Sequence, residues 1–174
     1  MGAPPFQVLL DTHGRDVHRF LIATVGRGEA DDCYQETWLA ALRAYPRLRD
    51  ASNLRAWVFR IAHNKAIDHL RAGSRRPVAV PDVAEVADRS AGVASGAGAV
   101  AGADPGAYPG AELDPDGAWG RVVALPPKQR AALALRFITD ASYAEIAAAM
   151  DTSEEAARRN VFEGLRRLRK EISS

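Results

Sequence analysis

A run of basic and amide side chains between Asn53 and Arg76 carries the chemistry that stands out in this sequence. On one side of a helix over this stretch lie Arg55, Arg60, Asn64, Lys65, Asp68, His69 and Arg71. Guanidinium and ammonium groups bind phosphates, whereas Asn, Asp and His side chains can hydrogen-bond to base edges. The pattern suits a helix that faces nucleic acid, although a merely solvated basic face fits the same residues about equally well.

The same stretch has the spacing of an amphipathic helix that could position these groups. Its apolar side chains recur at i, i+3, i+4 and i+7, as Leu54, Trp57, Val58 and Ile61. This spacing predicts a helix over residues 54–71 with one face in a core, and Trp57 belongs to that face. Gly73 and Pro77 mark the predicted end of the helix, where basic residues complement its dipole.

Composition and charge limit the possible classes of protein. The 174 residues carry a formal net charge of +1, but residues 77–118 have net charge −6 between segments of +4 and +3. Cys33 is the single cysteine, so an internal disulfide is excluded, and the histidines show no metal-ligand spacing. We find no signal peptide or membrane span, and expect a soluble cytoplasmic protein.

Two further helices are predicted before the basic one. The first runs from Asp11 to about Val25, and residues 26–30 break it, with glycines as stop signals. The second covers residues 31–45, with an apolar stripe of Tyr34, Trp38, Ala41, Leu42 and Tyr45. Off that stripe lie Asp32, Gln35 and Glu36. We interpret Cys33 as a packing residue, since no resolving cysteine exists.

The C-terminal third has the signals of a helix-turn-helix. Residues 128–137 form an apolar helical pattern, and Ser142 with Glu145 is a capping box that opens a helix over 143–150. Ser153 caps a longer helix with acidic residues in its first turn. The buried stripe of that helix is predicted to be Ala157, Val161, Leu165, Leu168 and Ile172. A short helix, a tight turn and a longer helix are typical of DNA-binding modules.

Several stretches resemble a known family. The segment LRAWVFRIAHNKAIDHLR resembles the part of bacterial sigma factors that melts and reads the promoter −10 element, and DDCYQETWLAALRAYPRL resembles the part that docks on RNA polymerase. LPPKQRAALALRF, SYAEIAAAM and TSEEAARRNVFEGLRRLRK resemble the domain that reads the −35 element. The chain is most similar to the extracytoplasmic-function (ECF, group IV) branch of the sigma-70 family, over about residues 11–76 and 119–172.

This resemblance implies an all-α fold of two small helical domains. A σ2-like helical bundle would span residues 11–76, and a σ4-like helix-turn-helix would span residues 119–172. Between them, the Ala-, Gly- and Pro-rich residues 77–118 are expected to form a flexible acidic linker. The chain departs from the family where Asp140-Ala141 replaces a glycine-containing turn, and where the recognition helix reads EEAARRNVFEGLRRL.

The resemblance also implies partners and residues that bind them. Docking on the clamp coiled coil of the largest polymerase subunit is expected of Asp32, Gln35 and Glu36. Binding of −10 DNA is expected of Arg47, Arg49, Asn53, Arg60, Asn64, Lys65, Asp68, His69, Arg71, Arg75 and Arg76. Binding of −35 DNA is expected of Glu155, Arg158, Arg159, Phe162 and Arg166. The polymerase flap and an anti-sigma factor are further implied partners, and no cofactor or metal is expected.

Two other classes stay open. An ordinary transcriptional regulator would use only the C-terminal helix-turn-helix and would bind an operator without polymerase. A sigma-like interaction protein would hold polymerase or an anti-sigma partner without initiating transcription. An enzyme is disfavoured, because the sequence has no nucleophile–base pair, metal spacing or glycine-rich phosphate loop.

Overall fold

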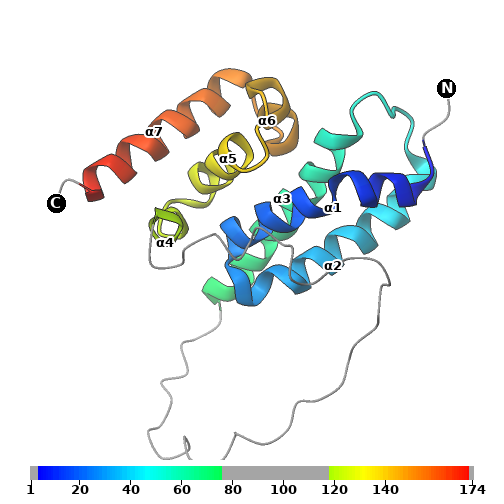
Figure 1. Cartoon of the computed structure of the whole chain (residues 1–174), viewed down its shortest axis with the longest axis horizontal. Helices are drawn as coiled ribbons and strands as arrows, with labels where there is room; N and C mark the ends of the chain where they lie inside the picture. The colour runs from blue at the N-terminus through cyan, green and yellow to red at the C-terminus, as the bar shows by residue number, and fades with distance from the viewer. Residues whose placement is uncertain (1–3, 76–117, 173–174) are drawn as a thin grey trace, which may run out of the picture.

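The computed structural model describes residues 4–75 and 118–172, and every regular element in these ranges is helical (Figure 1). The N-terminal elements are α1 (Phe6–Val25), α2 (Arg27–Ala44), the short 3-10 helix η1 (Tyr45–Arg47) and α3 (Leu54–Arg75). The C-terminal elements are α4 (Ala118–Val123), α5 (Pro127–Phe137), α6 (Tyr143–Met150) and α7 (Glu154–Ile172). The all-α prediction is confirmed. The predicted linker lies outside the described residues, except for its last residue.

Helices α1, α2 and α3 pack around apolar side chains from α1. Val17, Phe20 and Leu21 are fully buried, as their helical spacing predicts. Phe59 of α3 meets Phe20 edge to face, with ring centroids 5.7 Å apart. Trp57 packs partly buried against the same core, which confirms its predicted place on the apolar face. Each such side chain contributes about 1.5–3 kcal/mol when it is fully buried.

Helix α1 begins five residues earlier than the predicted start at Asp11. Pro5 occupies the N-cap position with extended backbone angles, and its fixed φ suits the entry to a helix. The first helical residue, Phe6, packs edge-on against Trp38 and Tyr45 at centroid distances of 5.9 and 5.3 Å. This long-range aromatic contact stabilises a first turn that local sequence signals did not reveal.

Helix α2 also begins earlier than predicted, at Arg27, because only Gly26 breaks the chain. Gly26 has φ +90°, a conformation that an L side chain rarely adopts. The buried face of α2 includes Ala30, Cys33, Thr37 and Ala41.

The prediction that Leu42 belongs to the buried stripe is wrong. Its side chain is 51% exposed, because it lies a step of about 100° around the helix from Ala41. The neighbouring prediction for Cys33 is confirmed, since this residue is buried. Burial, together with the nearby carboxylates of Glu36, Glu29 and Asp32, raises the pKa of the Cys33 thiol to about 11.

Helix α3 starts at the predicted residue and extends beyond the predicted stop. Asn53 caps it, since its Oδ1 accepts a hydrogen bond from the Ala56 amide at 2.9 Å. The helix continues through Gly73 to Arg75. A single glycine costs only about 1 kcal/mol relative to alanine inside a helix, so it does not force an end.

The C-terminal helices follow the sequence signals closely. Ser142 and Glu145 form the reciprocal capping box at the start of α6, with Ser142 Oγ accepting from the Glu145 amide at 3.2 Å. Ser153 Oγ accepts from the Ala156 amide at 3.2 Å and caps α7. Asp140 and Asp151 have φ of +49° and +52°, and aspartate tolerates this left-handed region better than most residues. Asp140 thus occupies a left-handed position that would also suit glycine.

A close approach between α5 and α7 holds these two helices together. Gly164 of α7 lies so near Leu133 that a Cβ there would be 2.8 Å from Leu133 Cδ1. Ala157 and Val161 are buried on the same side of α7, and Leu165 and Leu168 are partly buried. Four of the five predicted stripe residues are thereby confirmed, and the side chain of Ile172 lies outside the described set.

The two groups of helices pack on each other. Helix α3 lies against α6, and α1 lies against α5 and α4 (Figure 1). Arg130 of α5 is buried in this contact. Its Nη1 donates to the Thr24 carbonyl of α1 at 2.5 Å, and its Nη2 donates to the Leu125 carbonyl at 3.0 Å. A buried guanidinium therefore joins the two groups.

Candidate nucleic-acid interface

The polar side of α3 divides into two rows in the structure. Arg60, Asn64, Asp68 and Arg71 follow one another at i, i+4, i+8 and i+11 and face the C-terminal helices. The Arg60 Nε donates to the Ala148 carbonyl of α6 at 3.0 Å. The other three line a cavity between α3 and helices α5 to α7. This row therefore borders the C-terminal helices, while its four side chains remain exposed.

The second row faces α2 and is held by carboxylates. Lys65 Nζ lies 3.4 Å from Glu36 Oε2, and His69 Nε2 lies 2.6 Å from Glu29 Oε2. Lys65 was expected to bind DNA and Glu36 to bind polymerase, and the structure places them in contact. The carboxylate that the structure records beside Lys65 is that of Glu36.

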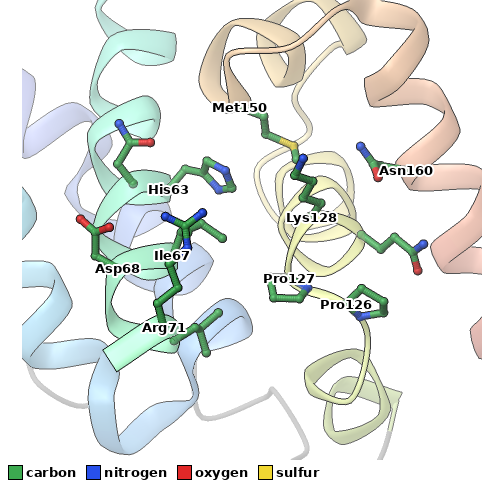
Figure 2. A pocket seen from close by; sticks show the side chains of 12 residues that line it. His63, Ile67, Asp68, Arg71, Pro126, Pro127, Lys128, Met150 and Asn160 are labelled. Atoms are coloured by element: carbon green, nitrogen blue, oxygen red, sulfur yellow. The ribbon is translucent and has the colours of Figure 1, made fainter. Parts of the chain in front are cut away.

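The cavity beside the first row has a volume of about 880 Å³ and a mixed lining. Figure 2 shows His63 directed from α3 toward it, with Lys128 and Met150 on the opposite wall. His63 is only 8% exposed, and its Nδ1 is buried without a hydrogen-bond partner. Burial, helped by the Lys128 ammonium, lowers the pKa of His63 to about 4. The imidazole is therefore neutral near pH 7.

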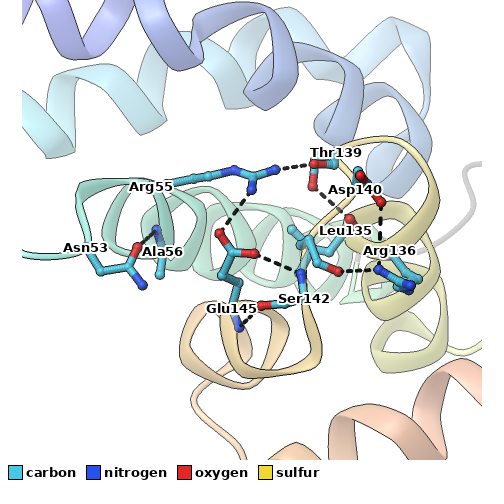
Figure 3. A network of polar contacts seen from close by, with 10 residues as sticks. Asn53, Arg55, Ala56, Leu135, Arg136, Thr139, Asp140, Ser142 and Glu145 are labelled. Carbon is cyan, nitrogen blue, oxygen red and sulfur yellow. Dashed lines mark hydrogen bonds and ion pairs between the residues drawn. The ribbon is translucent and has the colours of Figure 1, made fainter.

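A network of polar contacts joins the start of α3 to the turn between α5 and α6 and to the start of α6 (Figure 3). Arg55 Nη1 lies 3.0 Å from Glu145 Oε1, and its Nη2 donates to the Thr139 carbonyl. The other oxygen of Glu145 accepts from the Ser142 amide at 2.8 Å. Burial alone would raise the pKa of Glu145, but the bonds from Ser142 and the Arg55 charge outweigh it and lower the pKa. Sequence reasoning placed Arg55 on the polar face but could not find this partner, 90 residues away.

The loop before α3 presents two arginines to solvent. Arg47 and Arg49 are exposed, and neither is buried by the C-terminal helices. Asp50 Oδ1 accepts from the Ser52 amide at 2.8 Å, which shapes the turn. The predicted residue Asn53 is also exposed, although its Oδ1 is used to cap α3. At the far end of α3 the Arg75 side chain and the whole of Arg76 lie outside the described set.

The predicted polymerase-binding residues share an open face of α2. Asp32, Gln35 and Glu36 are all exposed and lie at i, i+3 and i+4. Leu39 and Leu42 continue the face and are 52% and 51% exposed. Sequence reasoning missed these leucines as surface residues. The spacing of Gln35, Leu39 and Leu42 at i, i+4 and i+7 was the available signal.

The predicted residues of α7 lie together on its outer side. Glu155, Arg158, Arg159 and Arg166 are exposed, and Phe162 is 67% exposed. Arg158 lies 5.0 Å from the centroid of the Tyr143 ring and 3.7 Å from Glu154 Oε2. The first two turns of α7 therefore offer cationic groups and one large apolar group to a partner.

Comparison with protein families identifies the family of this chain. The family described as "Sigma-70 region 2" matches residues 9–76, and the family described as "Sigma-70, region 4" matches residues 122–170. Together these matches cover about two thirds of the chain. The chain belongs to the sigma-70 family. Helices α1 to α3 thus correspond to region 2, and α5 to α7 correspond to region 4.

Curated sigma-70 relatives agree with the ECF branch. The ECF RNA polymerase sigma-E factors of Escherichia coli K12 and Salmonella typhimurium LT2 are 29% identical over 157 residues, which cover 90% of this chain and 81% of theirs. A probable sigma-C factor of Mycobacterium bovis is 41% identical over 63 residues, or 36% of this chain and 34% of its own. The predicted resemblance to ECF sigma factors is confirmed.

Solved structures share the fold. CnrH in complex with the cytosolic domain of CnrY has a TM-score of 0.63 at 19% identity, covering 97% of this chain and 87% of the other. The sigma factor RpoE of Bartonella quintana, solved with the anti-sigma factor NepR, has the same TM-score at 22% identity, covering 96% and 93%. In the described ranges of this sigma-70 protein, no helix is long and apolar enough to cross a bilayer.

Proposed function

We propose that this chain is an ECF-type sigma factor that binds core RNA polymerase and directs promoter-specific initiation of transcription. The observation that carries the proposal is the presence of sigma-70 regions 2 and 4, in that order, on one chain. A lone helix-turn-helix regulator would have no use for the first of these regions. The protein acts by binding and by altering DNA, and its own side chains perform no covalent chemistry.

Polymerase docks on the open face of α2 and on the C-terminal domain. Asp32, Gln35 and Glu36 supply hydrogen bonds and charge toward the clamp coiled coil of the largest subunit. Leu39 and Leu42, which are about half exposed, add apolar area to the same contact. The flap of polymerase binds the region 4 helices.

DNA at the −10 element binds the loop 47–53 and the polar side of α3. Arginine and lysine side chains hold phosphates, and Asn64, Asp68 and His69 contact bases. The row that begins at Arg60 borders the C-terminal helices, and Arg60 donates to a carbonyl of α6, but all four of its side chains are exposed. DNA that binds along this row would therefore replace the Arg60 bond to α6.

DNA at the −35 element binds the outer side of α7. The N-terminal part of a recognition helix enters the major groove, and this places Glu155, Arg158, Arg159 and Phe162 against base edges. Arg166, one turn further on, contacts phosphate. These side chains are exposed without any change of the domain arrangement.

An anti-sigma factor is the regulatory partner that we propose. The support is indirect: a fold neighbour, the sigma factor RpoE, was solved with an anti-sigma factor. Arg60 on the polar side of α3 already bonds to α6. A partner that bound both domains would stabilise this arrangement.

The direct test is reconstitution with core RNA polymerase from the bacterium that encodes the chain. We expect stable binding, followed by transcription from a genomic fragment library at discrete start sites that share −10 and −35 boxes. Binding without initiation would favour a sigma-like interaction protein. Sequence-specific DNA binding by the free chain, with no binding to polymerase, would contradict the proposal.

A surface variant separates docking from folding. Leu42→Glu places a charge on the exposed α2 face, so we expect at least a tenfold loss of polymerase affinity with an unchanged melting temperature. Thr152→Glu is the matched control, because it adds the same charge to an exposed turn between α6 and α7. Equal affinities for the two variants would exclude the α2 face as the docking surface.

A further inference from the structure

The ring of Tyr143 lies at the meeting point of two arginines from different helices. Tyr143 is the first residue of α6 and is partly buried against the core. The guanidinium carbon of Arg136, from α5, lies 5.4 Å from the ring centroid, and that of Arg158, from α7, lies 5.0 Å away. Both distances fall within the range of cation–π attraction.

The two arginines are held differently. The Arg136 Nη1 donates to the Ala141 carbonyl at 3.0 Å and lies 3.7 Å from Asp140 Oδ1, so this side chain is tied to the turn before α6. The Arg158 side chain is 64% exposed, and its other recorded contact is Glu154 on its own helix, at 3.7 Å. The Tyr143 ring is therefore the contact that links Arg158 to the rest of the domain.

We propose that Tyr143 is a positioning residue that orders Arg158 for recognition of one base pair of the −35 element. This inference rests on the proposed function of α7. A free arginine has many rotamers, and ordering it on binding costs affinity. A ring that holds the guanidinium in one orientation before DNA binds lowers this cost. The benefit is limited to a base that accepts hydrogen bonds from the guanidinium in that orientation.

The geometry gives Tyr143 an indirect role. Its ring belongs to the supporting helix, while Arg158 belongs to the helix that enters the groove. Arg136 also contacts the Tyr143 ring and restrains it from the side of the α5–α6 turn. The two like charges near one ring are accompanied by the carboxylates of Asp140 and Glu154. These carboxylates offset the repulsion between the two guanidinium groups.

The test selects DNA duplexes, randomised in the −35 segment, that bind reconstituted holoenzyme. Five chains are compared: unaltered, Arg158→Ala, Tyr143→Leu, Tyr143→Phe and the double variant Tyr143→Leu/Arg158→Ala. Arg158→Ala should relax preference at one base pair. Tyr143→Leu should relax preference at the same base pair by about fivefold, as expected for an exposed cation–π contact. Tyr143→Phe keeps the ring and should behave like the unaltered chain.

The double variant and the melting temperature complete the test. If Tyr143 acts through Arg158, the double variant selects the same sequences as Arg158→Ala alone. If Tyr143→Leu weakens all sequences in proportion and lowers the melting temperature, its role is structural and the proposal is overturned. If Arg158→Ala changes no base preference, Tyr143 has nothing to position and the inference fails, while polymerase-dependent initiation could still stand. A lack of any preference in the unaltered chain would refute −35 recognition itself.

Discussion

The polar sides of α3 and α7 arise from the same kind of sequence but have different surroundings in the folded chain. On α3, Arg60 donates to a carbonyl of α6, and Lys65 and His69 lie beside carboxylates of α2. On α7, Arg159 is exposed, Arg158 is 64% exposed beside the Tyr143 ring and Glu154, and Phe162 is mostly exposed. The first surface is engaged by the protein itself, and the second is open.

This difference shows that the sequence of a basic amphipathic helix does not reveal whether its polar side is free to bind a partner. A protein contact that covers a DNA-binding side chain must be broken before that side chain binds DNA, and its free energy is subtracted from the binding. On the outer side of α7, the contacts of Arg158 lie within the C-terminal helices. We therefore expect −35 contacts to form with the two domains in place, and a −10 contact through Arg60 to require that its bond to α6 breaks.

The largest expected effect comes from Arg130→Met, which removes the buried guanidinium between α1 and α5. The variant leaves the Thr24 and Leu125 carbonyls without their charged donors, and each such bond contributes about 1.5–3 kcal/mol. We expect the free energy of unfolding to fall by roughly 3–4 kcal/mol. Chemical denaturation measures it, and a loss below about 1 kcal/mol would show that water replaces these bonds.

Acid should lower the free energy of unfolding through the buried imidazole of His63. The pKa of His63 is about 4 in the folded protein and near 6.5 when unfolded, so the unfolded chain binds the proton first as pH falls. The destabilisation by His63 is absent above pH 6.5, and it should reduce the free energy of unfolding by about 2 kcal/mol at pH 5.

His63→Gln removes the titrating group and serves as the comparison for that prediction. The stability curves of the two proteins should diverge between pH 6.5 and pH 4. The difference can be assigned to His63, because the carboxylates that titrate in this range are common to both proteins. Parallel curves down to pH 5 would mean that His63 keeps its ordinary pKa.

A smaller effect is expected from Arg55→Ala, which removes the contacts with Glu145 and Thr139. Both side chains of the Arg55–Glu145 pair are about one quarter exposed, so we expect a loss of about 1–2 kcal/mol. The domains should separate more often, and small-angle scattering should report a larger radius of gyration. Arg159→Ala, on the open side of α7, is the matched control and should leave the radius unchanged. Equal radii for both variants would show that Arg55 does not hold the domains together.

The smallest effect is expected from Lys65→Ala. Its contact with Glu36 is partly exposed at 3.4 Å, and such pairs contribute about 0–1 kcal/mol. Stability should change by less than about 0.5 kcal/mol. Binding to polymerase should be preserved or improved, because the Glu36 carboxylate is released. A tenfold loss of polymerase affinity would instead place Lys65 in the docking surface.

Local signals in the sequence predicted the parts of the fold that depend on local chemistry. The serine caps placed the starts of α6 and α7 correctly, since each cap bonds an amide three residues away. The spacing of Val17, Phe20 and Leu21 predicted the core face of α1. These features involve neighbours along one helix, so they are visible without a structure.

Contacts between distant residues could not be predicted in the same way. The start of α1 depends on Phe6 packing against Tyr45, and the bond of Arg60 depends on the Ala148 carbonyl of α6. No periodicity links Arg55 to Glu145. The roles of the binding residues themselves stay predictions, since their partners are other molecules.

Glu145 gives the domain contact a further property. One of its oxygens accepts from Ser142 at the start of α6, and the other lies beside Arg55 of the N-terminal domain. When the domains separate, the second bond is lost but the first remains, so α6 keeps its cap. The helix-turn-helix can thus separate from the N-terminal domain as a rigid body. Breaking the interface leaves the helix-turn-helix folded.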